Sequence, residues 1–264
     1  MEHHTVTVDG LEYVYSRTGD KTKPAFLLLH GLTDNALMWT PVARRLQNDF
    51  EIYLLDFHGH GRSQRVDLAR GHSSTPADIL SSVTAALGLE KFGVMGHSMG
   101  ASFACQLAAT HPERINFVIL EDPPWQLATE QSTRRSPNQF RDWILGLQEK
   151  THEGVVEYGS SHHPLWLEED YPLWATAKLQ FDPNFLKLMR PPSVPWEEQI
   201  KLITAPALLI YGEQDKGSLV SEAAADLVRA TWGANHVIQI PNTTHHVQRD
   251  QHEAFMQAVN AFLP

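Results

Sequence analysis

The sequence predicts an α/β fold, with a mostly parallel central sheet covered by helices on both faces and an inserted helical cap. Short apolar runs alternate with helical patterns, and most of these runs lack the polar alternation of a half-exposed strand. The length of 264 residues suffices for one large domain that carries an insertion. The expected parallel strands are residues 25–29, 52–55, 92–95, 117–120, 207–211 and 237–240.

Further elements precede and follow the first of these strands. Residues 6–8 and 13–15 alternate between apolar and polar side chains, which predicts an antiparallel hairpin at the sheet edge. Residues 36–46 carry apolar side chains at helical spacing. Another helix is expected to begin at Thr75, because a capping threonine is followed by a proline in the first turn and an early acid.

The alternation of strands and helices stops between residues 125 and 195, where prolines punctuate both ends. We therefore expect residues 1–124 and 196–264 to form the core and residues 125–195 to form a helical cap, or lid. Ordinary packing helices are the alternative, but the many aromatic residues favour a wall over a pocket. The tryptophans of this stretch are Trp125, Trp143, Trp166 and Trp174.

The composition limits the possible partners and the cellular compartment. A net charge of −10, with scattered Lys and Arg, argues against nucleic acid as a partner. The first residues lack the pattern of a signal peptide and no apolar run has the length of a membrane span, so we expect a cytoplasmic protein. The single cysteine, Cys105, permits no intrachain disulfide and no thiolate metal cluster. The oligomeric state stays open.

Residues 96–100 read Gly-His-Ser-Met-Gly and lie between an apolar run and a run of small residues. This context is strand, sharp turn and helix, and we call residues 96–100 the elbow. A serine at such a turn is held in a strained conformation that exposes its hydroxyl to a base and a substrate carbonyl. Ser98 is therefore the candidate nucleophile.

A serine nucleophile needs a base, and an acid that orients the base. His245 follows the last predicted strand, and loops after parallel strands open at the same sheet edge as the elbow. His246, its neighbour, is not excluded by spacing. Asp215 and Asp122 both follow predicted strands and both preserve the order serine, acid, histidine.

The oxyanion of an acyl-transfer intermediate requires two backbone N–H donors. The amide of Met99, the residue after the nucleophile, is one candidate. The loop of residues 30–32 offers the amide of Leu32 as the second. His30 is expected to be a structural hydrogen-bonding residue.

These residues together resemble the α/β-hydrolase superfamily over essentially the whole chain. The resemblance implies a triad of Ser98, Asp215 and His245, an oxyanion hole from the Leu32 and Met99 amides, no cofactor, and a cap inserted after the strand that ends at Glu121. A minority of the family takes its acid from the strand before Asp122. The motifs that carry the resemblance are His30-Gly31, residues 56–63, 96–100 and 212–215, and His245.

The expected function is a serine hydrolase that cleaves a carboxylic ester of small to medium acyl, aryl or lactone type through an acyl-enzyme. The partner is then a small-molecule ester. Alternatives on the same triad are a carbon–carbon bond hydrolase or lyase and a ligand receptor. A metal-dependent hydrolase is suggested only by His58-Gly59-His60 and by histidine pairs at 162–163 and 245–246, and no metal site is expected.

Overall fold

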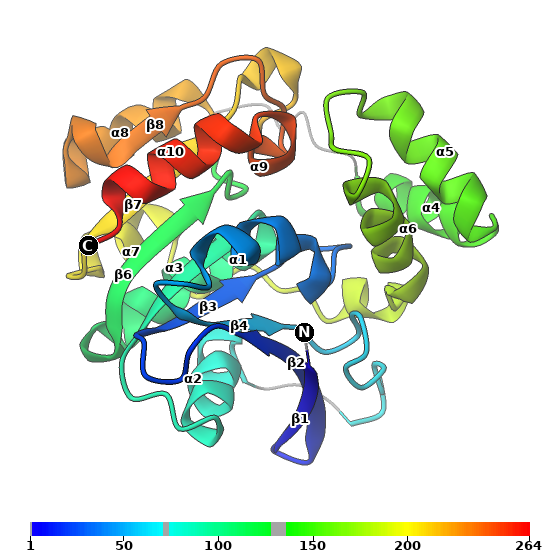
Figure 1. The fold of residues 1–264 in the computed structure, drawn as a ribbon, viewed down its shortest axis with the longest axis horizontal. Helices are drawn as coiled ribbons and strands as arrows, with labels where there is room; N and C mark the ends of the chain where they lie inside the picture. The colour runs from blue at the N-terminus through cyan, green and yellow to red at the C-terminus, as the bar shows by residue number, and fades with distance from the viewer. Residues whose placement is uncertain (1, 71–73, 128–135) are drawn as a thin grey trace.

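The computed structural model describes residues 2–70, 74–127 and 136–264, and the strands in these ranges form one sheet. The strand order is β1-β2-β4-β3-β5-β6-β7-β8 (Figure 1). The strands are β1 (Glu2–Val8), β2 (Leu11–Thr18), β3 (Ala25–Leu29), β4 (Glu51–Leu55), β5 (Phe92–His97), β6 (Ile115–Glu121), β7 (Ala207–Tyr211) and β8 (Val237–Gln239).

The sheet is mostly parallel, as the apolar runs predict. From β4 to β8 every neighbouring pair is parallel, and only the hairpin strands β1 and β2 are antiparallel to their neighbours. Strands β3 and β7 have the predicted bounds. All five residues of β4 are buried, because helices cover both faces and leave no polar side to the strand.

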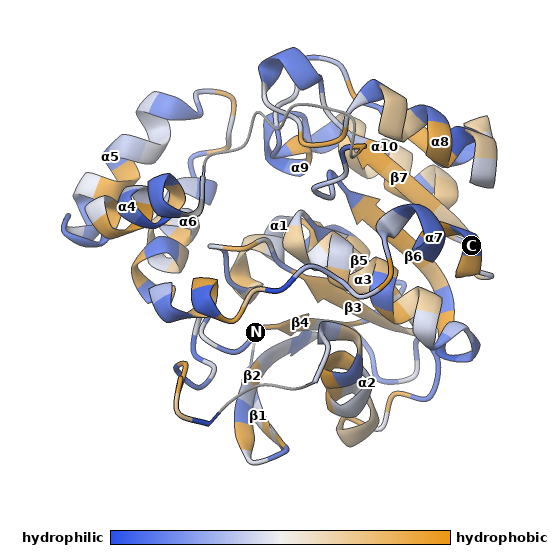
Figure 2. Cartoon of the chain, turned by 180° about the vertical axis from the view of Figure 1, so that it is seen from behind, coloured by the Kyte–Doolittle hydropathy of each residue, from blue (hydrophilic) through white to orange (hydrophobic). Residues whose placement is uncertain are grey.

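Helices on the two faces bury two separate apolar clusters against the sheet. Side chains of α1 and α10 pack with Phe26 and Ile210, whereas those of α2, α3, α7 and α8 pack with Leu27 and Leu209. Figure 2 shows β6 and β7 as hydrophobic strands between these layers. The helices are α1 (Thr40–Leu46), α2 (Pro76–Ala86), α3 (Met99–Thr110), α7 (Trp196–Leu202), α8 (Glu222–Trp232), α9 (Val247–Asp250) and α10 (His252–Phe262).

Local sequence signals explain where two helices begin. Thr75 caps α2 in a reciprocal capping box with Asp78, as expected. The predicted helix at residues 36–46 is divided into a 3₁₀ turn and α1, because Pro41 has no N–H to continue an α-helical ladder from the preceding turn. The 3₁₀ turns are η1 (Ala36–Trp39), η2 (Pro112–Arg114), η3 (Pro183–Lys187), η4 (Gln214–Lys216) and η5 (Ala234–His236).

The described part of residues 125–195 contains helices and no strand, and it gathers beside the sheet in Figure 1. Trp166 and Trp174 are buried in an apolar cluster that belongs to this segment, and Met38 of η1 packs into the same cluster. The rings of Trp125 and Trp196 stack with centroids 4.7 Å apart, so the two ends of the segment meet. Its helices are α4 (Pro137–Gln148), α5 (His152–His162) and α6 (Asp170–Gln180).

No helix within the described ranges combines the length and the apolar character that crossing a membrane requires.

Candidate active site

Ser98 stands at the turn between β5 and α3 with φ of 56° and ψ of −117°, a conformation that costs a non-glycine residue energy. The turn is tight because strand and helix approach closely. A Cβ on Gly96 would lie 2.2 Å from the carbonyl oxygen of Gly100, and one on Gly100 would lie 2.2 Å from that of Leu29. Only glycine fits at either position, and the hydroxyl of Ser98 is carried clear of the chain.

His245 lies in the loop between β8 and α9 and contacts Ser98. Its Nε2 lies 2.9 Å from Oγ of Ser98. The ring of His97 packs behind it, with Nε2 donating to the carbonyl oxygen of His245 at 2.9 Å. Residues of the elbow thus hold both the Ser98 nucleophile and the backbone of His245 in place.

Asp122 completes the hydrogen-bonded chain. Its Oδ2 lies 2.6 Å from Nδ1 of His245, and its side chain is fully buried. The same carboxylate accepts from the hydroxyl of Ser218 and from the amide of Leu219 at 2.8 Å. With Nδ1–H donating to Asp122, Nε2 of His245 is the nitrogen left to take the proton of Ser98.

The expectation that Asp215 orients His245 is corrected by this geometry. Asp215 lies in η4 and is exposed, while the two ring nitrogens of His245 face Ser98 and Asp122. The carboxylates differ in their surroundings. Asp122 leaves β6, beside the β5 strand of Ser98, and is buried and held by Ser218 and Leu219. Asp215 follows β7 and lies on an exposed turn.

His246 turns away from Ser98. Its ring packs against Trp166 and His97, and its Nδ1 lies 3.3 Å from Nη1 of Arg249. Burial and the neighbouring Arg249 guanidinium hold the pKa of His246 well below its usual range. The structure therefore brings His245 to the serine, in agreement with the choice that the resemblance implies.

The candidate oxyanion donors lie in two backbone segments. Met99 is the first residue of α3, so its amide has no acceptor within the helix. The carbonyl oxygen of Gly31 is held by Nδ1 of His30 at 2.8 Å and by the amide of Asp34 at 3.1 Å. In a trans peptide the N–H points opposite to the C=O, so the Leu32 amide points out of this loop.

A buried cluster of charges lies beside this loop. Oδ1 of Asp34 lies 2.6 Å from Nζ of Lys178, and its Oδ2 lies 2.9 Å from Nη2 of Arg249. Burial opposes ionisation of Asp34, but the two cations hold its pKa well below the usual range. Burial lowers the pKa of Lys178 to about 8, against the attraction of Asp34.

Sequence reasoning missed these three residues. One signal was available in α6, where Lys178 shares a helix face with Trp174 and Ala175, both buried. A lysine on an apolar face is almost never buried without a partner. The partner itself, Asp34, is far away in sequence and could not be deduced from spacing.

The histidines that suggested a metal site have other partners. Nδ1 of His60 lies 2.9 Å from the carbonyl oxygen of His58, and its Nε2 lies 2.5 Å from that of Leu32. His163 stacks on Trp166 with ring centroids 4.2 Å apart. Within the described ranges, no three His, Cys, Asp or Glu side chains are grouped so as to hold a metal ion.

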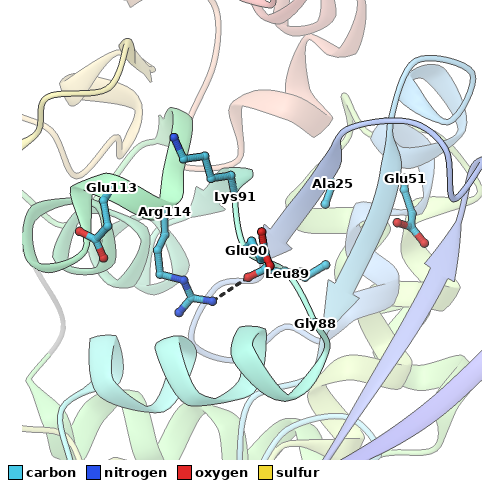
Figure 3. Close-up of a pocket in the computed structure, with 8 residues that line it drawn as sticks. All are labelled: Ala25, Glu51, Gly88, Leu89, Glu90, Lys91, Glu113 and Arg114. Atoms are coloured by element: carbon cyan, nitrogen blue, oxygen red, sulfur yellow. Dashed lines mark hydrogen bonds between the residues drawn. The ribbon is translucent and has the colours of Figure 1, made fainter.

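Figure 3 shows a separate hollow, which lies at the amino ends of β3 and β4. Ala25 and Glu51, the first residues of β3 and β4, line it, and Arg114 crosses it to donate to the carbonyl oxygen of Leu89 at 2.7 Å. Ser98 follows the carboxyl end of β5, so this hollow is not part of the candidate site.

Two curated relatives match nearly the whole chain. N-formylmaleamate deformylase of Pseudomonas putida is 27% identical over 98% of this chain and 95% of that protein. Pimeloyl-(acyl-carrier protein) methyl ester esterase of Aeromonas salmonicida is 26% identical over 91% of this chain and 95% of that protein.

Solved structures show the same fold. Naproxen esterase from Bacillus subtilis superposes with a TM-score of 0.77 at 19% identity, covering 99% of this chain and 90% of that one. E-2-(acetamidomethylene)succinate hydrolase gives 0.75 at 19% identity, with 99% and 98% covered. The family model described as alpha/beta hydrolase fold matches residues 24–259. The chain belongs to the alpha/beta hydrolase family.

Proposed function

We propose that this protein is a carboxylic ester hydrolase that works through an acyl-enzyme on Ser98. The observation that carries the proposal is the unbroken series of hydrogen bonds from Ser98 through His245 to the buried Asp122. Such a series activates a hydroxyl that is otherwise a weak nucleophile.

In the first half-reaction, Oγ of Ser98 bonds to the ester carbonyl carbon while Nε2 of His245 takes its proton. The tetrahedral intermediate then breaks its bond to the alcohol oxygen, and His245 returns the proton to that leaving group. In the second half-reaction, His245 takes a proton from water, the hydroxide attacks the acyl carbon, and the acid and free Ser98 are released. Asp122 stays ionised and stabilises the imidazolium in both.

The amides of Leu32 and Met99 are the proposed donors to the oxyanion. The orientation of each amide is set by its surroundings. Met99 begins α3, and the peptide that carries the Leu32 N–H is held by the hydrogen bond of His30 to its Gly31 oxygen. Preorganised donors of this kind each contribute about 10²–10³ in kcat.

We further propose that residues 125–195 act as a cap that selects a small to medium acyl, aryl or lactone ester. Leu32 and Phe185 pack against both the core cluster and the cluster of this segment, which supports a position next to the oxyanion loop. Phe185→Ala is expected to change the ranking of ester substrates by chain length. An unchanged ranking would remove Phe185 from substrate selection.

Hydrolysis of an amide is the second candidate. It is favoured by the whole-length similarity to a protein named N-formylmaleamate deformylase. The same triad serves either bond, because both reactions pass through an oxyanion and an acyl-enzyme.

The test is turnover of p-nitrophenyl esters of rising chain length, several lactones and an N-formyl amide by wild type and Ser98→Ala. Removing the hydroxyl should lower kcat at least about a thousandfold and abolish covalent labelling by a fluorophosphonate, with the fold kept. Retained activity in folded Ser98→Ala would overturn the mechanism. Turnover of the amide alone would move the assignment to the second candidate, and loss of activity with a chelator would favour a metal-dependent reaction.

A further inference from the structure

Three consecutive carbonyl groups of the loop after β3 are each held by a buried side chain. Nδ1 of His30 lies 2.8 Å from the oxygen of Gly31, and Nε2 of His60 lies 2.5 Å from the oxygen of Leu32. Nζ of Lys178 donates to the oxygen of Thr33 at 3.1 Å. The two histidines lie in the loops that follow β3 and β4, but Lys178 reaches the loop from α6 of the inserted segment.

The contact of Lys178 is connected to the candidate oxyanion donor through two peptide groups. Each is planar and trans, so holding its C=O also sets its N–H. The group held by Lys178 joins Thr33 to Asp34, and its N–H donates to the oxygen of Gly31 at 3.1 Å. The group that contains this oxygen carries the amide of Leu32.

The carboxylate of Asp34 strengthens the same arrangement. It accepts from Lys178 on one oxygen and from Arg249 on the other, so α6 and α9 hold this residue from two sides. Lys178 is only 1% exposed, and its Nζ also lies 4.8 Å from the ring centroid of Trp174. The buried ammonium thus donates to both Thr33 and Asp34 of the same loop.

Stability alone gives no reason for burying these charges. Replacing a buried ion pair by apolar groups of similar volume is often neutral or stabilising. Burying Lys178 requires a partner with good geometry, and the structure supplies one at the loop that the proposed reaction needs to be rigid.

We propose that Lys178 is a positioning residue for catalysis, which sets the orientation of the Leu32 amide through the Thr33–Asp34 peptide. The inserted helical segment then helps to build the oxyanion hole in addition to contacting substrate. This inference rests on the proposed function, because the amide matters only for a reaction that forms an oxyanion.

The test compares Lys178→Met with a matched control, Gln148→Leu. Nε2 of Gln148 donates to the backbone oxygens of Lys178 and Phe181, so its loss loosens α6 without touching the loop. Lys178→Met should lower kcat about 10–100-fold with KM little changed, a fraction of the effect of losing a donor. The inhibition constant of a trifluoromethyl ketone, which forms a tetrahedral adduct, should rise in parallel, whereas binding of the acid product should not.

Gln148→Leu should keep kcat within about threefold even where its Tm falls. Equal losses of kcat in the two variants, or unchanged kcat in folded Lys178→Met, would overturn the inference and leave Lys178 a structural residue. Amide hydrogen exchange over residues 30–36 gives a readout without turnover, and it should accelerate in Lys178→Met only. If wild type hydrolyses no ester or amide, the proposed function fails, and the exchange result still decides whether Lys178 holds the loop.

Discussion

Oδ2 of Asp122 lies 2.6 Å from Nδ1 of His245, and the two residues leave strands separated by the whole width of β7. The acid follows β6, the histidine follows β8, and β7 with its own loop acid stands between them. The contact is possible because the loop of His245 returns across the carboxyl edge of the sheet. His97 of the elbow holds that loop by its hydrogen bond to the His245 carbonyl oxygen.

Asp122→Asn should be nearly inactive. The neutral amide lacks the charge that stabilises protonated His245, and its NH2 group favours the wrong tautomer of the ring. Such a change costs up to about 10⁴ in kcat with the fold intact. Asp215→Asn, on the exposed turn η4, should keep kcat close to that of wild type. The measurement is steady-state turnover of one good ester by variants shown to be folded by circular dichroism, and the reverse ranking would restore Asp215 as the acid.

The two adjacent histidines should differ in the same assay. His245→Ala removes the proposed base and should lower kcat at least about a thousandfold. His246→Gln keeps an acceptor for Arg249 and should retain at least about a tenth of kcat, with a lowered Tm because its ring packs against Trp166. Similar kcat losses in both variants would contradict the assignment of His245 alone.

Glu121 predicts a pH dependence of stability. Burial raises the pKa of its side chain from 4.5 to about 8, although Oε1 accepts from the amide of Gln248. Between these values the folded protein keeps a proton that the unfolded chain releases, so the free energy of unfolding falls as pH rises. The slope reaches at most about 1.4 kcal/mol per pH unit.

Glu121→Gln removes this proton. Its stability relative to wild type, measured by urea unfolding, should therefore increase from about pH 5 to pH 8 and then level off. His97, whose pKa burial lowers to about 4, is present in both proteins and cancels in the difference. A difference in the free energy of unfolding between the two proteins that does not change with pH would show that Glu121 ionises normally in the fold.

Two glycines on helices should respond oppositely to alanine. A Cβ on Gly100 would lie 2.2 Å from the backbone oxygen of Leu29, so Gly100→Ala forces α3 from the sheet and should destabilise by at least about 2 kcal/mol. Gly146 lies within α4 with nothing within 4 Å of its Cβ position, and Gly146→Ala should stabilise by about 0.5–1 kcal/mol. Thermal unfolding of both variants is the check, and a stable Gly100→Ala would contradict the close packing.

Local patterns predicted the fold well because they act over a few residues. The apolar runs gave β3 and β7 with their bounds, Thr75 gave the start of α2, and the glycines around Ser98 gave the elbow. Each depends on steric or hydrogen-bonding rules that hold wherever the element lies.

The choice of acid depended on tertiary structure. Asp122 and Asp215 both follow parallel strands, and only the burial and the partners of each carboxylate distinguish them. The hydroxyl of Ser218 and the amide of Leu219, which hold Asp122, lie far from it in the sequence. Lys178 was missed for the same reason, because its function in the fold is defined by the distant Asp34.

The stacked rings of Trp125 and Trp196 have an evolutionary consequence. The chain leaves the sheet after β6 and returns to α7 at one place, so the stretch between them imposes no separation on the strands it interrupts. Recombination between related genes could exchange that stretch as a cassette, with one crossover near each tryptophan. Ser98, Asp122 and His245 all lie outside the cassette, so an incoming stretch that keeps a lysine at the place of Lys178 could bring a new substrate preference in one event with the triad unchanged.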